Sequence, residues 1–277
     1  LSKAGIPIIK DINETTASIS VEYEITAPDE NGNAEYYLVT DFYRMRYDET
    51  RIRLLDFERS ATQVFAPSRS VISNSGLILG VRSKNVDYMT NEEGSVTAFT
   101  QNGDLWSYAP DTGKFVEIFT FRKNENSDFR DARVEHDITI LDVADNGDVD
   151  FMVYGYMNRG EHEGNMGIAG YVYQTEANAL EERFFIPYSG SFTELEEDLN
   201  QLVCLNPSGM LYLYLKHAVY GIDLESRENM VVADRLEKGS YAVSVDQKRF
   251  AWQSGRSQGG AGVLYLMDLE TGQSQEI

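Results

Sequence analysis

The chain has 277 residues, and its 24 Lys and Arg against 45 Asp and Glu give a formal net charge of −21. Nucleic acids and anionic membrane surfaces attract clustered Lys and Arg, so this composition argues against either as a partner. Apolar residues make up 42% of the chain, enough for one large core or two smaller ones, and no apolar run is long enough to predict membrane insertion.

The N-terminal end contains one short apolar stretch, Ile6-Pro7-Ile8-Ile9. Pro7 lacks an N–H group and therefore suits an edge strand. We expect residues 6–12 to pack beside the last structural unit and to close a ring of such units there. The chain begins with Leu1 rather than Met, so we also expect it to be excised from a longer protein.

Hydrophobic periodicity predicts strands along most of the chain. Segments such as residues 19–25 and 211–215 are short, rich in β-branched or aromatic residues, and bounded by turn residues. Helical spacing with a possible N-cap, Thr193, occurs over residues 192–202, and one helical turn is expected near residues 128–134. The sequence therefore predicts an all-β protein with very little helix.

Two turn motifs recur along these strands. The first is a polar turn between apolar strands, found at Asn74-Ser75-Gly76, Asp145-Asn146-Gly147 and Asn206-Pro207-Ser208-Gly209, and without glycine at Asp246-Gln247-Lys248. The second follows the next strand, at Leu55-Asp56-Phe57-Glu58, Ile222-Asp223-Leu224-Glu225 and Met267-Asp268-Leu269-Glu270. The spacing between these motifs is about the length that four short strands with hairpin loops require.

These anchors divide the chain into five four-stranded units, at residues 17–66, 67–122, 136–188, 200–235 and 239–277. A four-stranded meander repeated at this pitch is typical of a β-propeller blade, which buries its apolar faces by stacking against its neighbours. We predict a single β-propeller domain of about five blades over residues 1–277. A β-sandwich, or two small all-β domains, is the alternative.

In the last two units, the turn after the first strand and the Asp-Leu-Glu turn after the third resemble the TolB-like and YVTN-like families of bacterial propellers. The resemblance covers these two units well and the others loosely. It implies the propeller fold, and it implies nothing definite about a ligand.

Candidate catalytic and metal-binding patterns are better explained as structure. Gly255–Gly259 matches the G-x-S-x-G motif of hydrolases, but a glycine-rich hairpin follows it instead of a helix. Glu161-His162-Glu163 has no second histidine nearby, His136 and His217 are isolated, and the acidic cluster over residues 142–150 lacks the EF-hand register. No pair of carboxylates is marked as a glycosidase pair. We therefore predict no catalytic residue, no metal and no cofactor.

The segment from Asp41 to Tyr47 is the best candidate for a binding surface, because Tyr and Arg are typical of interaction hot spots. The candidate residues are Tyr43, Arg44, Arg46 and Tyr47. In a strand these side chains alternate between the two faces, so packing within a blade is the alternative.

We expect a non-catalytic, extracytoplasmic propeller of a bacterial surface or membrane-anchored protein, which binds a protein or glycan ligand. Two alternatives remain open. The first is an enzyme, or the substrate-gating part of one, that acts on glycans or peptides. The second is a structural scaffold for neighbouring domains.

Overall fold

The computed structural model describes residues 5–28, 32, 34–48, 50–65, 71–73, 76–77, 86–122, 130, 135–254 and 262–277. The G-x-S-x-G match at Gly255–Gly259 and most of the expected helical turn at 128–134 lie outside these residues. The chain divides into two compact units. The first unit comprises residues 1–88 and 99–134, and the second comprises residues 89–98 and 135–277.

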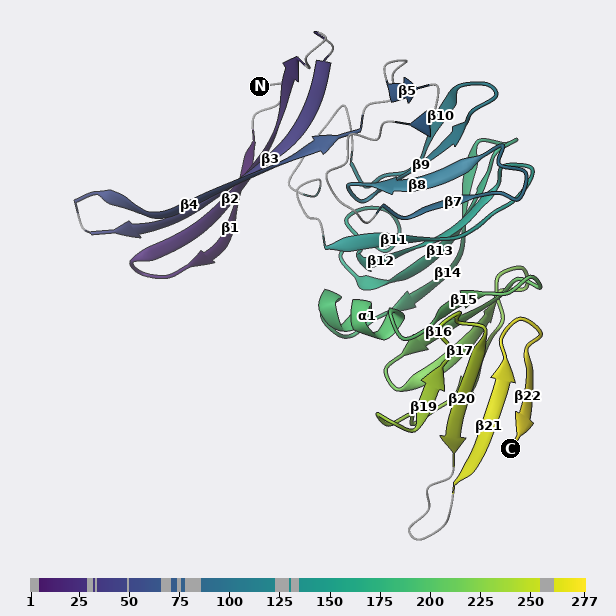
Figure 1. Ribbon diagram of the computed structural model, residues 1–277. Coiled ribbons are helices and arrows are strands. Elements are labelled where there is room, and N and C mark those ends of the chain that lie inside the picture. Colours follow the sequence, from purple (N-terminus) through teal and green to yellow (C-terminus); the bar gives the residue numbers. More distant parts are fainter. Residues whose placement is uncertain are drawn as a thin grey trace. The chain divides into compact units, whose positions relative to one another are not determined.

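The chain forms five four-stranded antiparallel sheets, each a meander of strands that are consecutive in sequence (Figure 1). The predicted all-β fold of about five four-stranded units is therefore confirmed. The first sheet contains β1 (Ile6–Ile12), β2 (Thr16–Pro28), β3 (Ala34–Tyr47) and β4 (Ile52–Val64). A short pair, β5 (Ile72–Ser73) and β6 (Gly76–Leu77), precedes the second sheet, which contains β7 (Tyr88–Thr90), β8 (Thr97–Gln101), β9 (Asp104–Ala109) and β10 (Lys114–Phe119).

The remaining three sheets belong to the second unit. The third contains β11 (His136–Val143), β12 (Val149–Tyr156), β13 (Met166–Gln174) and β14 (Ala179–Pro187), and helix α1 (Phe192–Leu199) follows it. The fourth contains β15 (Val203–Leu205), β16 (Met210–Leu215), β17 (Ala218–Asp223) and β18 (Asn229–Ala233). The fifth contains β19 (Tyr241–Val243), β20 (Arg249–Ser254), β21 (Val263–Asp268) and β22 (Gln273–Glu276).

The N-terminal strand does not pair with the last sheet, so our expectation for residues 6–12 is wrong. β1 pairs antiparallel with β2 and forms the edge of the first sheet, with Ile9 opposite Ile19. The turn that joins them is stabilised by Asn13, whose Oδ1 accepts hydrogen bonds from the N–H groups of Thr15 and Thr16 at 3.1 and 2.9 Å. A tight turn of this kind closes a hairpin at a lower entropic cost than pairing with a distant strand.

Aromatic side chains form the core of the first unit. The ring of Phe65 contacts those of Phe99, Trp106 and Phe115, with centroid distances of 5.4 to 5.5 Å. The first sheet itself buries little. Every residue of β4 from Ile52 to Thr62 is exposed.

Two apolar cores run through the second unit. One lies between the third sheet, α1 and the fourth sheet, and its members include Met152, Ile168 and Leu213, each fully buried. The other lies between the fourth and fifth sheets, around Phe250 and Leu269. The fourth sheet contributes to both cores, because Leu211 and Leu213 of β16 belong to the first and Tyr212 and Tyr214 to the second.

Helix α1 begins two residues earlier than a cap at Thr193 would allow. Ser191 is the N-cap, and its Oγ accepts a hydrogen bond from the N–H of Glu194 at 3.2 Å. The Glu194 carboxylate accepts in return from the Ser191 N–H at 2.8 Å, which completes a capping box. Leu195 and Leu199 face the core as expected.

The recurrent turns have a structural cause. Gly147 and Gly209 adopt left-handed backbone angles, with φ of +86° and +82°. Gln247 takes the same conformation at the turn that lacks glycine, with φ of +54°. In the second motif, Asp268 Oδ1 accepts hydrogen bonds from the N–H and hydroxyl groups of Thr271. Asp268 therefore stabilises a turn.

The motif at Leu55–Glu58 forms no turn, because these residues lie within β4 and pair with β3, so the prediction is wrong there. Asn74 and Ser75 of the first motif lie outside the described residues.

Candidate functional site

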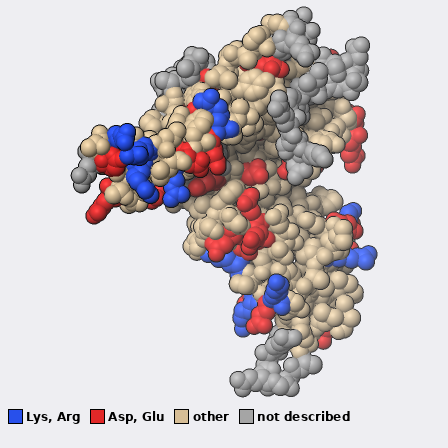
Figure 2. Space-filling view, turned by 60° about the vertical axis from the view of Figure 1, so that its left-hand side comes forward, with Lys and Arg blue, Asp and Glu red and all other residues tan. Residues whose placement is uncertain are grey.

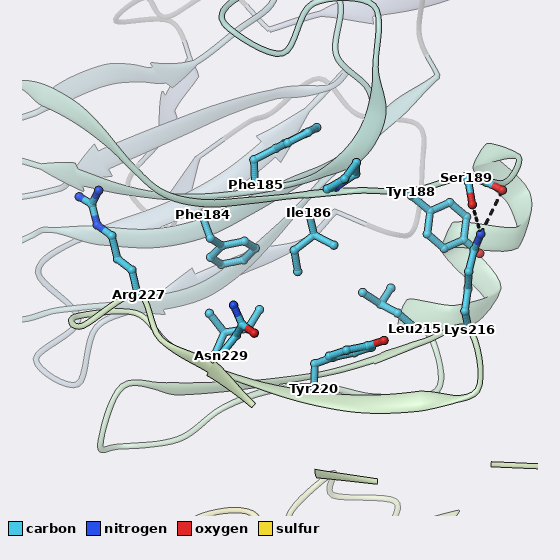
Figure 3. Close-up of a pocket in the computed structure, with 12 residues that line it drawn as sticks. Phe184, Phe185, Ile186, Tyr188, Ser189, Leu215, Lys216, Tyr220, Arg227 and Asn229 are labelled. Atoms are coloured by element: carbon cyan, nitrogen blue, oxygen red, sulfur yellow. Dashed lines mark hydrogen bonds between the residues drawn. The ribbon is translucent and has the colours of Figure 1, made fainter. Parts of the chain in front are cut away.

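A pocket of about 330 Å³ lies within the second unit, between the outer strand β14 of the third sheet and strands β16 to β18 of the fourth (Figure 3). This volume is at the lower end of the range of small-molecule sites, about 300 to 1,000 Å³. The walls are mainly apolar, and a basic side chain lies at each end (Figure 3).

Side-chain alternation along β14 builds the first wall. Phe184 and Ile186 point into the pocket, whereas Phe185 points away from it (Figure 3). Phe185 stacks on the ring of His162 on the other side, with a centroid distance of 3.7 Å. Leu215 and Tyr220, on β16 and β17, form part of the facing wall.

A glycine on the neighbouring strand makes room for the aromatic wall. Gly170 of β13 pairs directly with Phe184. A Cβ atom at residue 170 would lie 2.6 and 2.7 Å from two atoms of the Phe184 ring, closer than carbon atoms can approach. Only glycine at this position lets the ring lie flat against the sheet.

Lys216 closes one end of the pocket. Its Nζ donates hydrogen bonds to the carbonyl oxygen and the Oγ of Ser189, at 3.0 and 2.5 Å, and lies 4.6 Å from the centre of the Tyr188 ring. Among the described residues, no carboxylate forms an ion pair with Lys216. Burial, together with a hydrogen bond to Asp198, raises the pKa of Tyr188.

The backbone at this end is strained. Lys216 and His217 form the two-residue hairpin turn between β16 and β17, with φ angles of +45° and +66°. The corresponding turn between β8 and β9 uses Asn102-Gly103, the residue types that such turns favour. This turn places the Lys216 side chain at the end of the pocket.

Arg227 and Asn229 lie at the other end of the pocket (Figure 3). The guanidinium of Arg227 donates to Glu181 Oε1 at 2.8 Å, and Arg183 donates to the same oxygen at 3.0 Å. Two guanidinium groups share one carboxylate, which leaves positive charge in excess. A basic side chain therefore lies at each end of the pocket, in a chain whose net charge is −21, and at the Lys216 end the Asp198 carboxylate accepts a hydrogen bond from the Lys216 N–H.

A second cavity, of about 490 Å³, opens beside the inner strands β11 and β15 and the turn after β19. Its lining is about equally polar and apolar, with Thr139, Asn200 and Gln247 beside Leu141, Val203 and Leu205. Asp246 is the one carboxylate among its described lining residues, and its Oδ1 accepts hydrogen bonds from the Ser244 hydroxyl and the Lys248 N–H. This lining does not offer the pair of carboxylates that a glycosidase needs.

The residues predicted as a binding surface lie on β3 and are divided between two faces of the first sheet. Tyr43 and Tyr47 share one face, and Arg44 and Arg46 share the other. The Tyr43 ring lies 5.1 Å from that of Phe57. The two arginines are neighbours on their face, whereas Met45 lies between the two tyrosines on the other.

Asp41 organises the tyrosine face and was not singled out from the sequence. It is 2% exposed, and its carboxylate accepts from Arg59 Nε at 2.6 Å and Nη2 at 2.8 Å. Tyr43 and Tyr23 donate to the same carboxylate at 3.0 and 3.2 Å. The hydrogen bonds from Arg59 and the tyrosines lower the pKa of Asp41 to about 2.

The other sequence candidates have structural partners. His162 Nε2 lies 2.8 Å from Glu182 Oε1, and His217 Nδ1 lies 3.0 Å from the Leu236 carbonyl oxygen. In the acidic cluster, burial and the facing Asp142 raise the pKa of Asp150 to about 6. Within the described part of the chain, no three His, Cys, Asp or Glu side chains gather as a metal site. No described helix is long and apolar enough to cross a membrane.

No protein-family profile matches the chain, and no curated protein matches it. Among solved structures, the chain is similar to an oligogalacturonate lyase in complex with manganese, at 11% identity and a TM-score of 0.38. It is also similar to TolB from Acinetobacter baumannii, at 11% identity and a TM-score of 0.34. A third is the β-propeller domain of the Trilobed protease from Pyrococcus furiosus, at 12% identity and a TM-score of 0.38.

These matches cover 89%, 94% and 99% of this chain, respectively. The chain spans 65% of the lyase, 59% of TolB and 72% of the protease domain. The similar structures thus include β-propeller proteins.

The pocket was not found from the sequence, although two signals for it exist. One is the Lys216-His217 turn, which stands where the pattern of two apolar strands calls for Asn or Gly. The other is the run of three consecutive apolar residues in β14, Phe184 to Ile186, which gives that strand two apolar faces. Local patterns do not reveal which strand of another sheet lies opposite.

Proposed function

We propose that this chain is a non-catalytic ligand-binding module and that its ligand occupies the pocket between β14 and β16 to β18. The observation that carries this proposal is an apolar pocket with a basic side chain, Lys216 or Arg227, at each end, in a strongly acidic protein. The ligand then has an apolar body and at least one anionic group. A peptide segment with an acidic side chain next to an apolar one has this chemistry, so the partner is a protein.

A glycan fits the pocket less well. Sugars need several hydrogen-bond partners, whereas the middle of this pocket presents Phe184, Ile186 and Leu215. The cavity beside the inner strands has one carboxylate, Asp246, among its described lining residues, which likewise supports binding over glycan cleavage.

The test uses two fluorescent probes with the same apolar type of body. One is 8-anilinonaphthalene-1-sulfonate, which carries an anionic group, and the other is the neutral N-phenyl-1-naphthylamine. Replacing Lys216 by Met should weaken binding of the sulfonate about five- to tenfold, because an exposed charge-assisted contact contributes about 1 kcal/mol. Binding of the neutral probe should not change. Ile186→Trp fills the pocket and should weaken the binding of both probes.

Lys114→Met is the matched control, because Lys114 is an exposed lysine on β10 and is not among the residues that line the pocket. It should leave both affinities as in the wild type. Equal sulfonate affinity in the wild type and in Lys216→Met would show that the pocket does not select an anion, and the proposal would fail.

We further propose that the module acts outside the cytoplasm, as part of a bacterial surface or membrane-anchored protein. The resemblance of the last two sheets to TolB-like repeats supports this location, and the acidic composition is compatible with it. Fractionation of cells that produce the full-length gene product tests it directly. Recovery of that product in the cytoplasmic fraction alone would refute the location without affecting the pocket.

A further inference from the structure

The first sheet has one apolar face that is open to solvent. Side chains that lie opposite each other on neighbouring strands point to the same face, so the strand register defines each face. Three adjacent rows on one face are apolar: Ile9–Ile19–Tyr43–Phe57, Ile12–Ala17–Met45–Leu54 and Tyr47–Ile52. We call the six exposed members the arm face: Ile9, Ile12, Tyr47, Ile52, Leu54 and Phe57.

The arm face is large for a solvent-exposed apolar surface. Its six side chains are between 42% and 68% exposed. At roughly 100 Å² or more each, they present an apolar area on the order of 700 Å², above the 300 to 600 Å² typical of the largest patch on a monomer. It approaches the roughly 800 Å² that each partner contributes to a stable protein interface.

The opposite face of the same sheet is charged. Its exposed side chains include Arg44, Arg46, Arg53, Asp56 and Glu58. Figure 2 shows basic and acidic side chains intermixed over this sheet. A sheet with one apolar and one charged face is typical of a sheet that is covered on its apolar side.

We propose that the arm face packs against the arm face of a second copy of this chain. A partner that is recognised by charge would need an unpaired acidic or basic group on the face. The next row along the sheet instead holds Asp41 and Arg59, which pair with each other. A face without net charge can meet its own copy about a two-fold axis without opposing like charges.

The geometry of such a dimer follows from the sheet itself. Two sheets stack face to face about 10 Å apart, with strands nearly aligned and side chains interdigitated. Tyr43 and Phe57 lie in the row nearest the Asp41–Arg59 pair, so that pair forms a polar boundary at one end of the interface.

The salt dependence of association distinguishes this dimer from a complex driven by opposite charges. Each copy carries a net charge of −21, so the two copies repel each other through charges outside the interface. Salt screens that repulsion. Dimerisation should therefore strengthen between about 0.05 and 0.5 M NaCl, whereas a complex driven by opposite charges would weaken.

Sedimentation velocity of the 277-residue chain, from about 1 to 100 µM, tests the proposal in the range of ordinary interface affinities. The wild type should sediment as a dimer at the upper end. Ile52→Glu should raise the dimer Kd about tenfold or more, since it places a charge in each copy of the apolar interface. Ser60→Glu adds the same charge on the opposite face of β4 and should leave the Kd unchanged.

Two results would overturn the proposal. One is a wild type that remains monomeric at about 100 µM and 0.5 M NaCl. The other is an equal effect of Ile52→Glu and Ser60→Glu. A different outcome is a chain that remains monomeric and floats with phosphatidylcholine vesicles in a density gradient. If Ile52→Glu then abolishes this flotation, the arm face binds a lipid surface and not a second copy. Both substituted residues are exposed, so circular dichroism should report an unchanged fold for each variant.

Discussion

Replacing Gly170 by Ala tests how the wall of the pocket is built. The new methyl group would overlap the Phe184 ring, and overfilling of a packed site costs about 1 to 3 kcal/mol. The φ angle of Gly170 is not left-handed, so alanine also restores the roughly 0.5 to 1 kcal/mol that glycine forfeits inside a strand. The net expectation is a loss of about 1 to 2 kcal/mol, or a fall in Tm of about 2 to 8 °C.

A double-mutant cycle isolates this overlap. Phe184→Leu removes the ring, so Gly170→Ala should cost nothing in that background, and calorimetry should give a coupling of about 1 to 3 kcal/mol between the two sites. Gly221→Ala is the control. Gly221 occupies the corresponding third strand of the fourth sheet, and a Cβ there would meet the flexible Met230 side chain at 3.2 Å. The Tm of the Gly221→Ala variant should therefore change little. An equal loss of stability from Gly170→Ala with and without the Phe184 ring would refute the overlap.

Three further predictions concern single side chains. Asp41→Asn should destabilise the protein by about 1 to 3 kcal/mol, because it removes the charged acceptor of the Arg59 guanidinium. Because the folded pKa of Asp41 is about 2 and the unfolded value is higher, the wild type should lose this stability as the pH falls from about 4 to 2, and calorimetry of Asp41→Asn should show a smaller loss over that range. For Asp150 the sign is reversed, because a folded pKa of about 6 means that its ionisation opposes folding as the pH rises through that value. Asp150→Asn should therefore raise the Tm near pH 7.5 and leave it unchanged near pH 4, and an equal shift at both pH values would contradict the assignment. Ser191→Ala should cost about 1 kcal/mol in a urea titration, and no measurable cost would mean that the capping box of α1 contributes nothing.

The sequence predicted the repeat better than it predicted the turns and the ends. Strands of the third to fifth sheets follow from short apolar segments between Asp-containing and Gly-containing turns, which are local signals. The left-handed conformation of Gln247 could not be anticipated, because it is imposed by the strands on either side of the turn. The Ser191 cap could have been found, because Ser-x-x-Glu before an apolar residue is the pattern of a capping box.

The candidate site was less predictable, because it depends on contacts between distant segments. Alternation along β3 was recognised, and it correctly implies that Tyr43 and Arg44 point to opposite faces. The sequence does not indicate that Tyr43 lies on an exposed apolar face, since burial is decided by what covers the sheet. The pocket between Phe184 and Tyr220 likewise exists only because two sheets meet.

Each sheet uses only neighbouring strands, which has a consequence for synthesis on the ribosome. A nascent chain grows by about 5 to 20 residues per second, whereas a hairpin forms in about 1 to 10 µs, so each sheet can form long before the next one emerges. During that wait, the third sheet would present the apolar residues Met152 and Ile168 to water. Helix α1 emerges immediately after β14, and its Leu195 and Leu199 belong to the same core. We therefore expect the helix to cover part of this apolar face before the fourth sheet is synthesised.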